Sequence, residues 1–264
     1  MPLALCATPI GNLEDVTLRV LAELRDADVV LCEDTRHTRV LLERHGLRDA
    51  RLVSYHEHNE AARTAELLPR LEAGERMALV SDAGMPGVSD PGSRIVRAAL
   101  DAGVPVTVLP GPSAVETALV ASGLGGGPFR FLGFLPRGEA ALASVWTDVP
   151  DVAVAFESPR RLPATLRSLA AAEPARPVAV CRELTKRFEE VVRGTAAELA
   201  GRFAEPPKGE ITLVLGPSAR VPDDAAALAA VAELVEAGVP RRRAAELVSG
   251  LTGVPRNRLY RGSL

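Results

Sequence analysis

Short apolar runs alternate with helix-like segments through the first half of the chain, and this alternation constrains the fold most. We predict strands at 3–7, 28–32, 52–54, 77–80 and 104–110. The segments between them have helical spacing of apolar residues, and several end at a glycine. Such alternation is typical of a mostly parallel sheet that is covered by helices on both faces. Ligands of such sheets bind at the carboxyl ends of the strands, where loops 8–12, 33–36, 81–92 and 110–114 fall.

The second half indicates a mixed α/β domain and then a helical module. We predict further strands at 129–135, 152–158, 177–184, 189–195 and 209–216, with helices at 161–173 and 196–203. Gly125–Gly127 is a candidate linker, and another linker begins at Pro217 and runs to Pro222. We therefore expect an N-terminal α/β domain at 1–116, a second α/β domain at 117–217 and a basic three-helix module at 223–264.

Composition excludes several classes of protein. No run of about twenty apolar residues is present, and the N-terminus lacks the basic segment of a signal peptide, so we expect no membrane span and no secretion. Cys6, Cys32 and Cys181 are widely spaced, without CxxC or histidine pairing. That pattern argues against a disulfide framework and against a metal site, and it favours the reducing cytoplasm. The sequence also lacks the GxSxG elbow of hydrolases, the Walker loop of P-loop proteins and the GxGxxG motif of Rossmann NAD-binding folds, so these three classes lose their main support.

Positive charge gathers at the C-terminal end of a chain whose net charge is −3. Residues 241–264 hold six arginines and one acid, Glu246, a local charge of +5. Two interpretations stay open, a helix-turn-helix-like module over nucleic-acid phosphate and a structural cap with a solvated arginine face. The turn within LTGVPRNRL, between short amphipathic helices, favours the first.

The loop SDAGMPGVSDPG at 81–92 follows a predicted buried strand and combines three glycines with two aspartates. Glycines after a strand often bring backbone N–H groups close to a phosphate, but this loop has no lysine and its charged side chains are acidic. A phosphate would be repelled. We expect a ligand with hydroxyl, amine or cationic groups.

Two clusters of mixed charge follow strands in the two halves. The first contains Glu33, Asp34 and Arg36, and the second contains Arg182, Glu183 and Lys186. Clusters at strand ends in both domains would face each other across a cleft between the domains. In the alternative interpretation of the first cluster, Asp34 caps a helix and Arg36 is solvated. Ser158 and Pro159 are likewise candidates for the start of a helix, at its N-cap and first position.

Eight segments, taken together and in order, resemble a known family. They are TPIGNLEDVTLRVLAEL, CEDTRHTRVLL, LVSDAGMPGVSDPG, PGPSAVETALVASGL, FLGFLPR, FESPRRL, CRELTKRFEE and KGEITLVLG. The chain resembles the tetrapyrrole-methylase-like superfamily of S-adenosylmethionine methyltransferases, in its ribosomal RNA small subunit methyltransferase I branch. Ser81-Asp82-Ala83 stands where corrin-modifying relatives carry Gly-Asp-Pro, so this loop follows the RNA branch.

The resemblance implies two α/β domains of the tetrapyrrole methylase type with S-adenosylmethionine in the cleft between them. It also implies a helix-turn-helix appendage and a homodimer. The pocket positions that it implies, together with the acidic loop, are Ile10, Asp82, Gly84, Met85, Ser113, Ala114, Ser158, Cys181 and Thr212. The implied reaction methylates a cytidine ribose 2′-hydroxyl in small-subunit ribosomal RNA, free or within the assembled small subunit.

Such a reaction needs the ribose oxygen to be oriented and its proton removed. Glu33, Asp34 and Glu183 are the candidate bases, and Arg36, Arg182 and Lys186 are candidates for binding phosphate or stabilising the oxyanion. The reaction requires no metal. Two alternatives stay open: a methyltransferase acting on a corrinoid or another small molecule, and a nucleic-acid-binding protein without catalytic activity.

Overall fold

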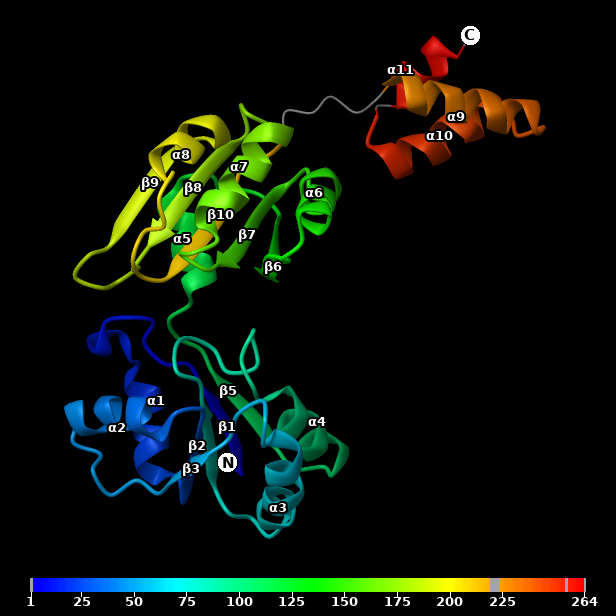
Figure 1. The fold of residues 1–264 in the computed structure, drawn as a ribbon. Helices are drawn as coiled ribbons and strands as arrows, with labels where there is room; N and C mark the ends of the chain where they lie inside the picture. The colour runs from blue at the N-terminus through cyan, green and yellow to red at the C-terminus, as the bar shows by residue number, and fades with distance from the viewer. Residues whose placement is uncertain (1, 219–223, 255, 264) are drawn as a thin grey trace. The chain divides into compact units, whose positions relative to one another are not determined.

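The computed structural model describes residues 2–218, 224–254 and 256–263, which divide into two compact units at Pro217/Ser218. The expected linker lies largely outside the described residues, as does Asp223, the expected start of the helical module. The expected boundary at 116/117 falls inside a helix that packs on the second sheet. Figure 1 shows the two sheets of the first unit and the helices of the second.

The first sheet has five parallel strands in the order β3-β2-β4-β1-β5, as the alternation predicts. Its strands are β1 (Leu3–Cys6), β2 (Val29–Cys32), β3 (Leu52–Ser54), β4 (Met77–Val80) and β5 (Val106–Leu109). Its helical segments are η1 (Leu13–Asp15), α1 (Leu18–Asp26), α2 (Thr35–Arg44), α3 (Glu60–Glu72) and α4 (Ser93–Asp101). Because β2, β4 and β1 are neighbours, the loops that follow them meet at one edge of the sheet.

Helices cover both faces of this sheet because successive side chains of a strand point to opposite faces. Ala4 and Cys6 pack on the face with α1 and α2, and Leu3 and Leu5 pack on the face with α3 and α4. All four residues of β1 are buried, as in a strand covered on both sides. The resulting layers are a doubly wound α/β sandwich.

The second sheet is mixed, with the order β6-β7-β10-β8-β9. Only the β6–β7 pair is parallel among its described pairings. The strands are β6 (Phe129–Phe134), β7 (Val152–Glu157), β8 (Pro177–Arg182), β9 (Glu190–Thr195) and β10 (Ile211–Leu215). The helices are α5 (Ala114–Ser122), α6 (Glu139–Asp148), α7 (Leu162–Ala172) and α8 (Ala196–Arg202). Helix α5 packs on one face, while α6, α7 and α8 pack on the other.

Two local features differ from the sequence-based expectation. Helix α6 was not predicted. Helix α7 begins at Leu162, in agreement with the predicted helix at 161–173, and not at the alternative start Pro159. Ser158 instead forms a turn in which its carbonyl oxygen accepts the N–H groups of Arg161 and Leu162. The expected N-cap at Ser158 is therefore wrong. Asp34, by contrast, is the N-cap of α2, and its carboxylate accepts the N–H of Arg36 at 2.8 Å.

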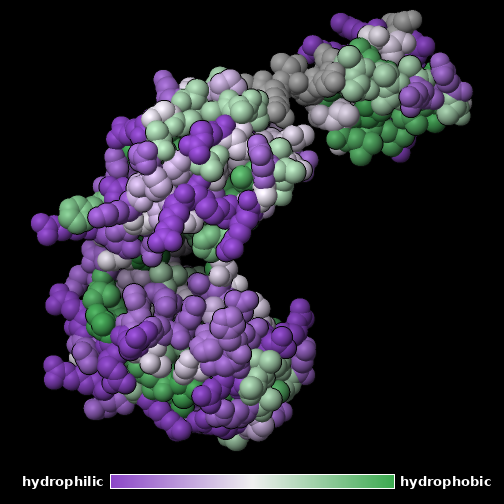
Figure 2. Space-filling view, viewed as in Figure 1, coloured by the Kyte–Doolittle hydropathy of each residue, from purple (hydrophilic) through white to green (hydrophobic). Residues whose placement is uncertain are grey.

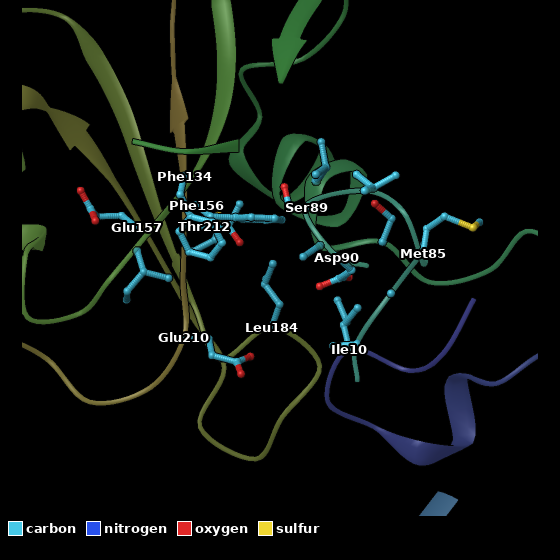
Figure 3. A pocket seen from close by; sticks show the side chains of 18 of the residues that line it. Ile10, Met85, Ser89, Asp90, Phe134, Phe156, Glu157, Leu184, Glu210 and Thr212 are labelled. Carbon is cyan, nitrogen blue, oxygen red and sulfur yellow. The ribbon is translucent and has the colours of Figure 1, made fainter. Parts of the chain in front are cut away.

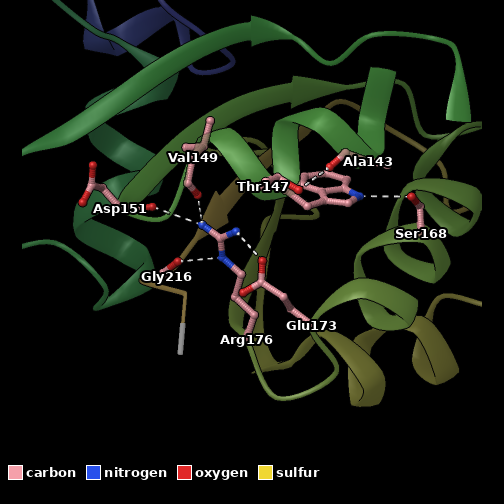
Figure 4. A network of polar contacts seen from close by, with 9 residues as sticks. Ala143, Thr147, Val149, Asp151, Ser168, Glu173, Arg176 and Gly216 are labelled. Carbon is pink, nitrogen blue, oxygen red and sulfur yellow. Dashed lines mark hydrogen bonds and ion pairs between the residues drawn. The ribbon is translucent and has the colours of Figure 1, made fainter. Parts of the chain in front are cut away.

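A buried arginine ties the start of β8 to two distant segments (Figure 4). Arg176 is 1% exposed. Its guanidinium donates to the carbonyl oxygen of Gly216 at 2.9 Å and to that of Val149 at 2.6 Å, and it pairs with the Glu173 carboxylate at 3.4 Å. These contacts join the ends of α6, α7 and β10.

The second unit contains α9 (Asp224–Glu236), α10 (Arg241–Thr252) and α11 (Arg256–Gly262). A small core of alanine, valine and leucine side chains holds the three helices together. Gly253 caps the C-terminal end of α10, and its φ of 73° is the left-handed conformation that glycine adopts at low cost. The arginines at 242, 243, 256, 258 and 261 are exposed.

Figure 2 shows hydrophilic side chains over much of the visible face of the first unit, whose buried apolar residues form the interior clusters. Among the helices of the described residues, none has the length and apolar character needed to cross a bilayer.

Candidate functional site

A cavity of about 360 Å³ opens beside the carboxyl ends of the strands of the first sheet (Figure 3). Both halves of the first unit contribute to its wall. Ile10 and Gly84 come from the loops after β1 and β4, Ser113 precedes α5, and Cys181 and Thr212 lie on β8 and β10. A cavity of this volume holds a small organic ligand.

Eight of the nine predicted cofactor positions line this cavity. They are Ile10, Gly84, Met85, Ser113, Ala114, Ser158, Cys181 and Thr212. The ninth, Asp82, borders a separate small hollow together with Thr8 and Ser81. Its carboxylate accepts the backbone N–H of Asp34 at 3.2 Å, so Asp82 holds the loop after β2 beside the loop after β4.

Backbone contacts fix the loop after β4 against the loop after β1. Thr8 and Gly84 form an isolated antiparallel bridge, with N–H to carbonyl distances of 2.8 and 3.1 Å. Gly84 has φ of +83°, a conformation that L side chains rarely adopt. The Thr8 hydroxyl also donates to the carbonyl oxygen of Ser81 at 3.0 Å. The cavity wall on this side is thus held by backbone hydrogen bonds.

Left-handed backbone at non-glycine residues is confined to two loops of the described chain. Ser89, which lines the cavity, has φ of 63°, and Glu183 and Thr185 have φ of 52° and 64° on either side of the cavity residue Leu184. Such conformations are costly for residues with a Cβ and tend to gather at functional sites. Both loops therefore hold strain next to the cavity.

Three aromatic and aliphatic side chains that the sequence did not single out also line the cavity. The rings of Phe134 and Phe156 lie 5.4 Å apart between centroids, and Leu184 faces them in Figure 3. Cys181 is buried, and burial raises the pKa of its thiol to about 11, so the thiol stays protonated at neutral pH. The wall is therefore suited to binding a flat or apolar group and not to thiolate chemistry.

The charged side chains of the cavity wall are all carboxylates. Asp90, Glu157 and Glu210 line it, and no Lys, Arg or His is among the lining residues in the described part of the chain. Sequence reasoning did not single out these three as cavity residues, although Asp90 lies in the acidic loop whose ligand was expected to be neutral or cationic. A phosphate-bearing ligand would find no counter-charge in this wall.

None of the six predicted catalytic residues lines the cavity. In the first cluster, Asp34 pairs with Arg36 at 2.7 Å, and this contact holds the pKa of Asp34 below its ordinary value. Burial raises the pKa of Glu33, and the neighbouring charge of Asp82 adds to this shift. Glu33 is thus the strongest base among the carboxylates of this cluster.

The second cluster is internally paired. The Glu183 carboxylate accepts the N–H of Glu210 at 2.9 Å and pairs with Lys186 at 3.0 Å, contacts that lower its pKa. Lys186 also pairs with Glu210 at 2.9 Å, and Arg182 with Glu190 at 3.2 Å. Within the described residues, no hydrogen bond or ion pair joins this cluster to the first. No group of three His, Cys, Asp or Glu able to hold a metal is found in the same described residues.

Comparison with known proteins agrees with this geometry. Residues 2–200 match the family of tetrapyrrole (corrin/porphyrin) methylases, and residues 221–262 match the RsmI C-terminal HTH domain. The first of these matches covers the first sheet, every strand of the second sheet except β10, and every residue of the cavity wall before Gly201.

Curated relatives and a solved structure are similar over most of the chain. Ribosomal RNA small subunit methyltransferase I of Mesorhizobium japonicum is 45% identical, with 98% of this chain and 90% of that protein covered. The protein of the same name from Micromonospora olivasterospora is 46% identical, with 98% and 85% covered. The uroporphyrin-III-C-methyltransferase structure from Thermus thermophilus is 26% identical, with a TM-score of 0.57 and 81% of this chain and 92% of that chain covered. The chain therefore belongs to the tetrapyrrole (corrin/porphyrin) methylase family, in its ribosomal RNA small subunit methyltransferase I branch.

Proposed function

We propose that the protein transfers a methyl group from S-adenosylmethionine to a cytidine ribose 2′-hydroxyl of small-subunit ribosomal RNA, as a cytoplasmic homodimer. The observation that carries the proposal is the cavity between the strand ends, whose wall combines aromatic, hydroxyl and carboxylate groups without a basic residue. The names of the relatives support ribosomal RNA as the substrate. The choice of cytidine and of its ribose 2′-hydroxyl rests on the resemblance of the eight motifs to the family.

The residues of the wall fit S-adenosylmethionine. This molecule carries a sulfonium, an ammonium, ribose hydroxyls and an adenine ring, and it has no phosphate. Phe134 and Phe156 offer apolar surface for the ring, while Ser113, Ser158 and Thr212 offer hydroxyl groups. When bound, the sulfonium supplies an already activated methyl group.

The remaining task of the protein is to orient the acceptor oxygen and to remove its proton as the new C–O bond forms. Of the three candidate bases, Glu33 is favoured, because burial raises the pKa of its carboxyl group whereas hydrogen bonds lower those of Asp34 and Glu183. Arg36, with its side chain 89% exposed, is available to a phosphate of the substrate. Arg182 and Lys186 are held by carboxylates and shape the loop that carries Leu184.

We expect Glu33→Gln and Arg36→Ala to lower the turnover of methyl transfer by about tenfold to a hundredfold, a range typical for removing one acid–base or charge-stabilising group. The equilibrium Kd for S-adenosylmethionine should stay within about twofold, because neither side chain lines the cavity. Single-turnover assays and equilibrium dialysis would measure the two quantities. Arg167→Ala, at an exposed position of α7, is the matched control. Full turnover in both variants would remove these residues from the proposed catalytic group.

The function itself is tested by methyl transfer from labelled S-adenosylmethionine to small ribosomal subunits from cells that lack the protein. The modified RNA is then treated with alkali, which cleaves beside a free 2′-hydroxyl and spares a 2′-O-methylated nucleotide. Labelled, alkali-resistant dinucleotides that begin with cytidine are expected. Label in an alkali-labile mononucleotide would place the methyl group on a base, and transfer to a tetrapyrrole with none to RNA would favour the small-molecule alternative.

A further inference from the structure

Asp90 differs from the other two carboxylates of the cavity wall in its partners. Glu157 accepts the N–H of Ser158 at 2.7 Å and the hydroxyl of Thr165 at 2.6 Å, and it pairs with Arg161 at 3.3 Å. Figure 3 shows its carboxylate turned away from the other labelled side chains. Glu210 pairs with Lys186. Asp90 has no ion pair among the described residues, and the nearby hydroxyl of Ser81 donates to the carbonyl oxygen of Gly84 at 3.1 Å.

The groups around Asp90 deepen its negative potential. Burial raises the pKa of Asp90 to about 6, and the charges of Glu33, after β2, and Asp82, after β4, add to this shift. On the opposite side of the cavity, the charge of Glu210 is balanced by its ion pair with Lys186. Burial raises the pKa of Glu33, and the charge of His56, after β3, lowers it.

An unpaired, partly buried carboxylate is unfavourable for the folded state at neutral pH. The folded protein binds a proton at Asp90 more readily than the unfolded chain does, so this group lowers stability as the pH rises from about 4 to about 6, and the loss is complete above that window. Groups kept at such a cost are typical of functional sites.

The methyl donor and its product differ in net charge. S-adenosylmethionine carries an ammonium, a carboxylate and a sulfonium, a net charge of +1, whereas S-adenosylhomocysteine has a neutral thioether and a net charge of zero. The amino-acid end is a zwitterion in both compounds, so the attraction of its ammonium to the Asp90 carboxylate is largely offset by the repulsion of its own carboxylate. Only the sulfonium of S-adenosylmethionine adds a net positive charge that Asp90 attracts.

We propose that Asp90 is the specificity-determining residue that makes the cavity prefer S-adenosylmethionine over S-adenosylhomocysteine, by holding the sulfonium charge. The proposal rests on the cofactor given above and does not depend on which RNA atom is methylated. Methyl transfer removes the positive charge from sulfur, so the attraction ends with the reaction and the product is released more readily.

The test is equilibrium binding of both compounds, by calorimetry, to the wild-type protein and to Asp90→Asn. We expect the variant to lose about tenfold of its preference for S-adenosylmethionine, while the Kd for S-adenosylhomocysteine stays within about twofold. Asp101→Asn, which removes the same charge at an exposed position at the end of α4, should change neither Kd. An unchanged ratio of the two Kd values, including the case in which both compounds are weakened equally, would overturn the proposal. Failure of wild-type protein to bind either compound would overturn the cofactor as well.

The wild-type protein offers a second measurement. Lowering the pH from 7.5 to 5 protonates Asp90, so the preference for S-adenosylmethionine should shrink in wild type and stay constant in Asp90→Asn. The variant should also unfold at higher urea concentration than wild type at pH 7.5, with the difference lost near pH 4. A preference that does not change with pH in wild type would contradict the role of Asp90.

Discussion

Removing residues 223–264 is expected to leave S-adenosylmethionine binding unchanged and to weaken RNA binding strongly. Every residue of the cavity wall lies before Pro217, and the helices α9, α10 and α11 form a core from their own side chains. The deleted segment carries the six C-terminal arginines. Each lost phosphate contact makes the plot of log affinity against log salt concentration less steep by about 0.7–0.9. The deletion should therefore reduce the steepness by up to about 4–5.

The measurement is RNA affinity of full-length and shortened protein over a range of salt concentrations. A full-length triple variant, Arg242→Ala with Arg256→Ala and Arg261→Ala, separates lost charge from lost helices, because these three side chains are exposed and lie outside the small core. The triple variant should show about half of the change in slope that the deletion causes. Identical affinities and slopes in all three proteins would make the module a structural cap. Since phosphate contacts carry no sequence information, choice of the nucleotide is expected to remain with the first unit.

Arg176→Ala is expected to lower the free energy of unfolding by about 3–5 kcal/mol, the range seen when one partner of a buried ion pair is removed. The substitution leaves the buried Glu173 carboxylate without this cation and removes the donors to the Gly216 and Val149 carbonyl oxygens. Urea unfolding would measure the loss as a shift of the midpoint at constant slope.

Two controls accompany this prediction. Arg176→Lys keeps the charge but has a single ammonium in place of the planar fork, so an intermediate loss is expected. Arg202→Ala removes an exposed pair with Glu190 and should cost less than about 1 kcal/mol. A loss below about 1 kcal/mol for Arg176→Ala would mean that the contacts in Figure 4 are not needed for stability.

The first sheet was predictable because each of its strands is a short apolar run and each helix has a polar face. Parallel strands that are buried on both faces have that pattern, and the structure confirms it for the fully buried strands β1, β2 and β4. Helix α6 was missed because its sequence, EAALASVWTD, has weak amphipathic character and no side-chain cap. The predicted helix at 161–173 matches α7, whereas the alternative start at Ser158 and Pro159 is wrong, because a Ser-Pro pair is equally compatible with a turn that precedes the helix.

The cavity was predictable in part. Family motifs placed Ile10, Gly84 and Thr212, yet nothing local distinguishes Asp90 from Asp82 in the same acidic loop. Which of the two faces the cavity depends on the bridge between Thr8 and Gly84, a contact over 76 residues that no sequence window contains. The charge clusters show the same limit, since Arg182 is the last residue of β8 and its guanidinium pairs with Glu190 on the neighbouring strand.

The connection between the two sheets has a consequence for ligand binding. Strand β5 ends at Leu109 and α5, which packs on the second sheet, begins at Ala114, so four residues join the halves. The last of them, Ser113, lines the cavity together with Ala114 and Val115. A hinge movement of one half against the other must displace these residues. If the halves adopt more than one angle, that angle is thermodynamically linked to ligand affinity: the protein binds a ligand that prefers one angle more tightly when a partner holds the halves at that angle.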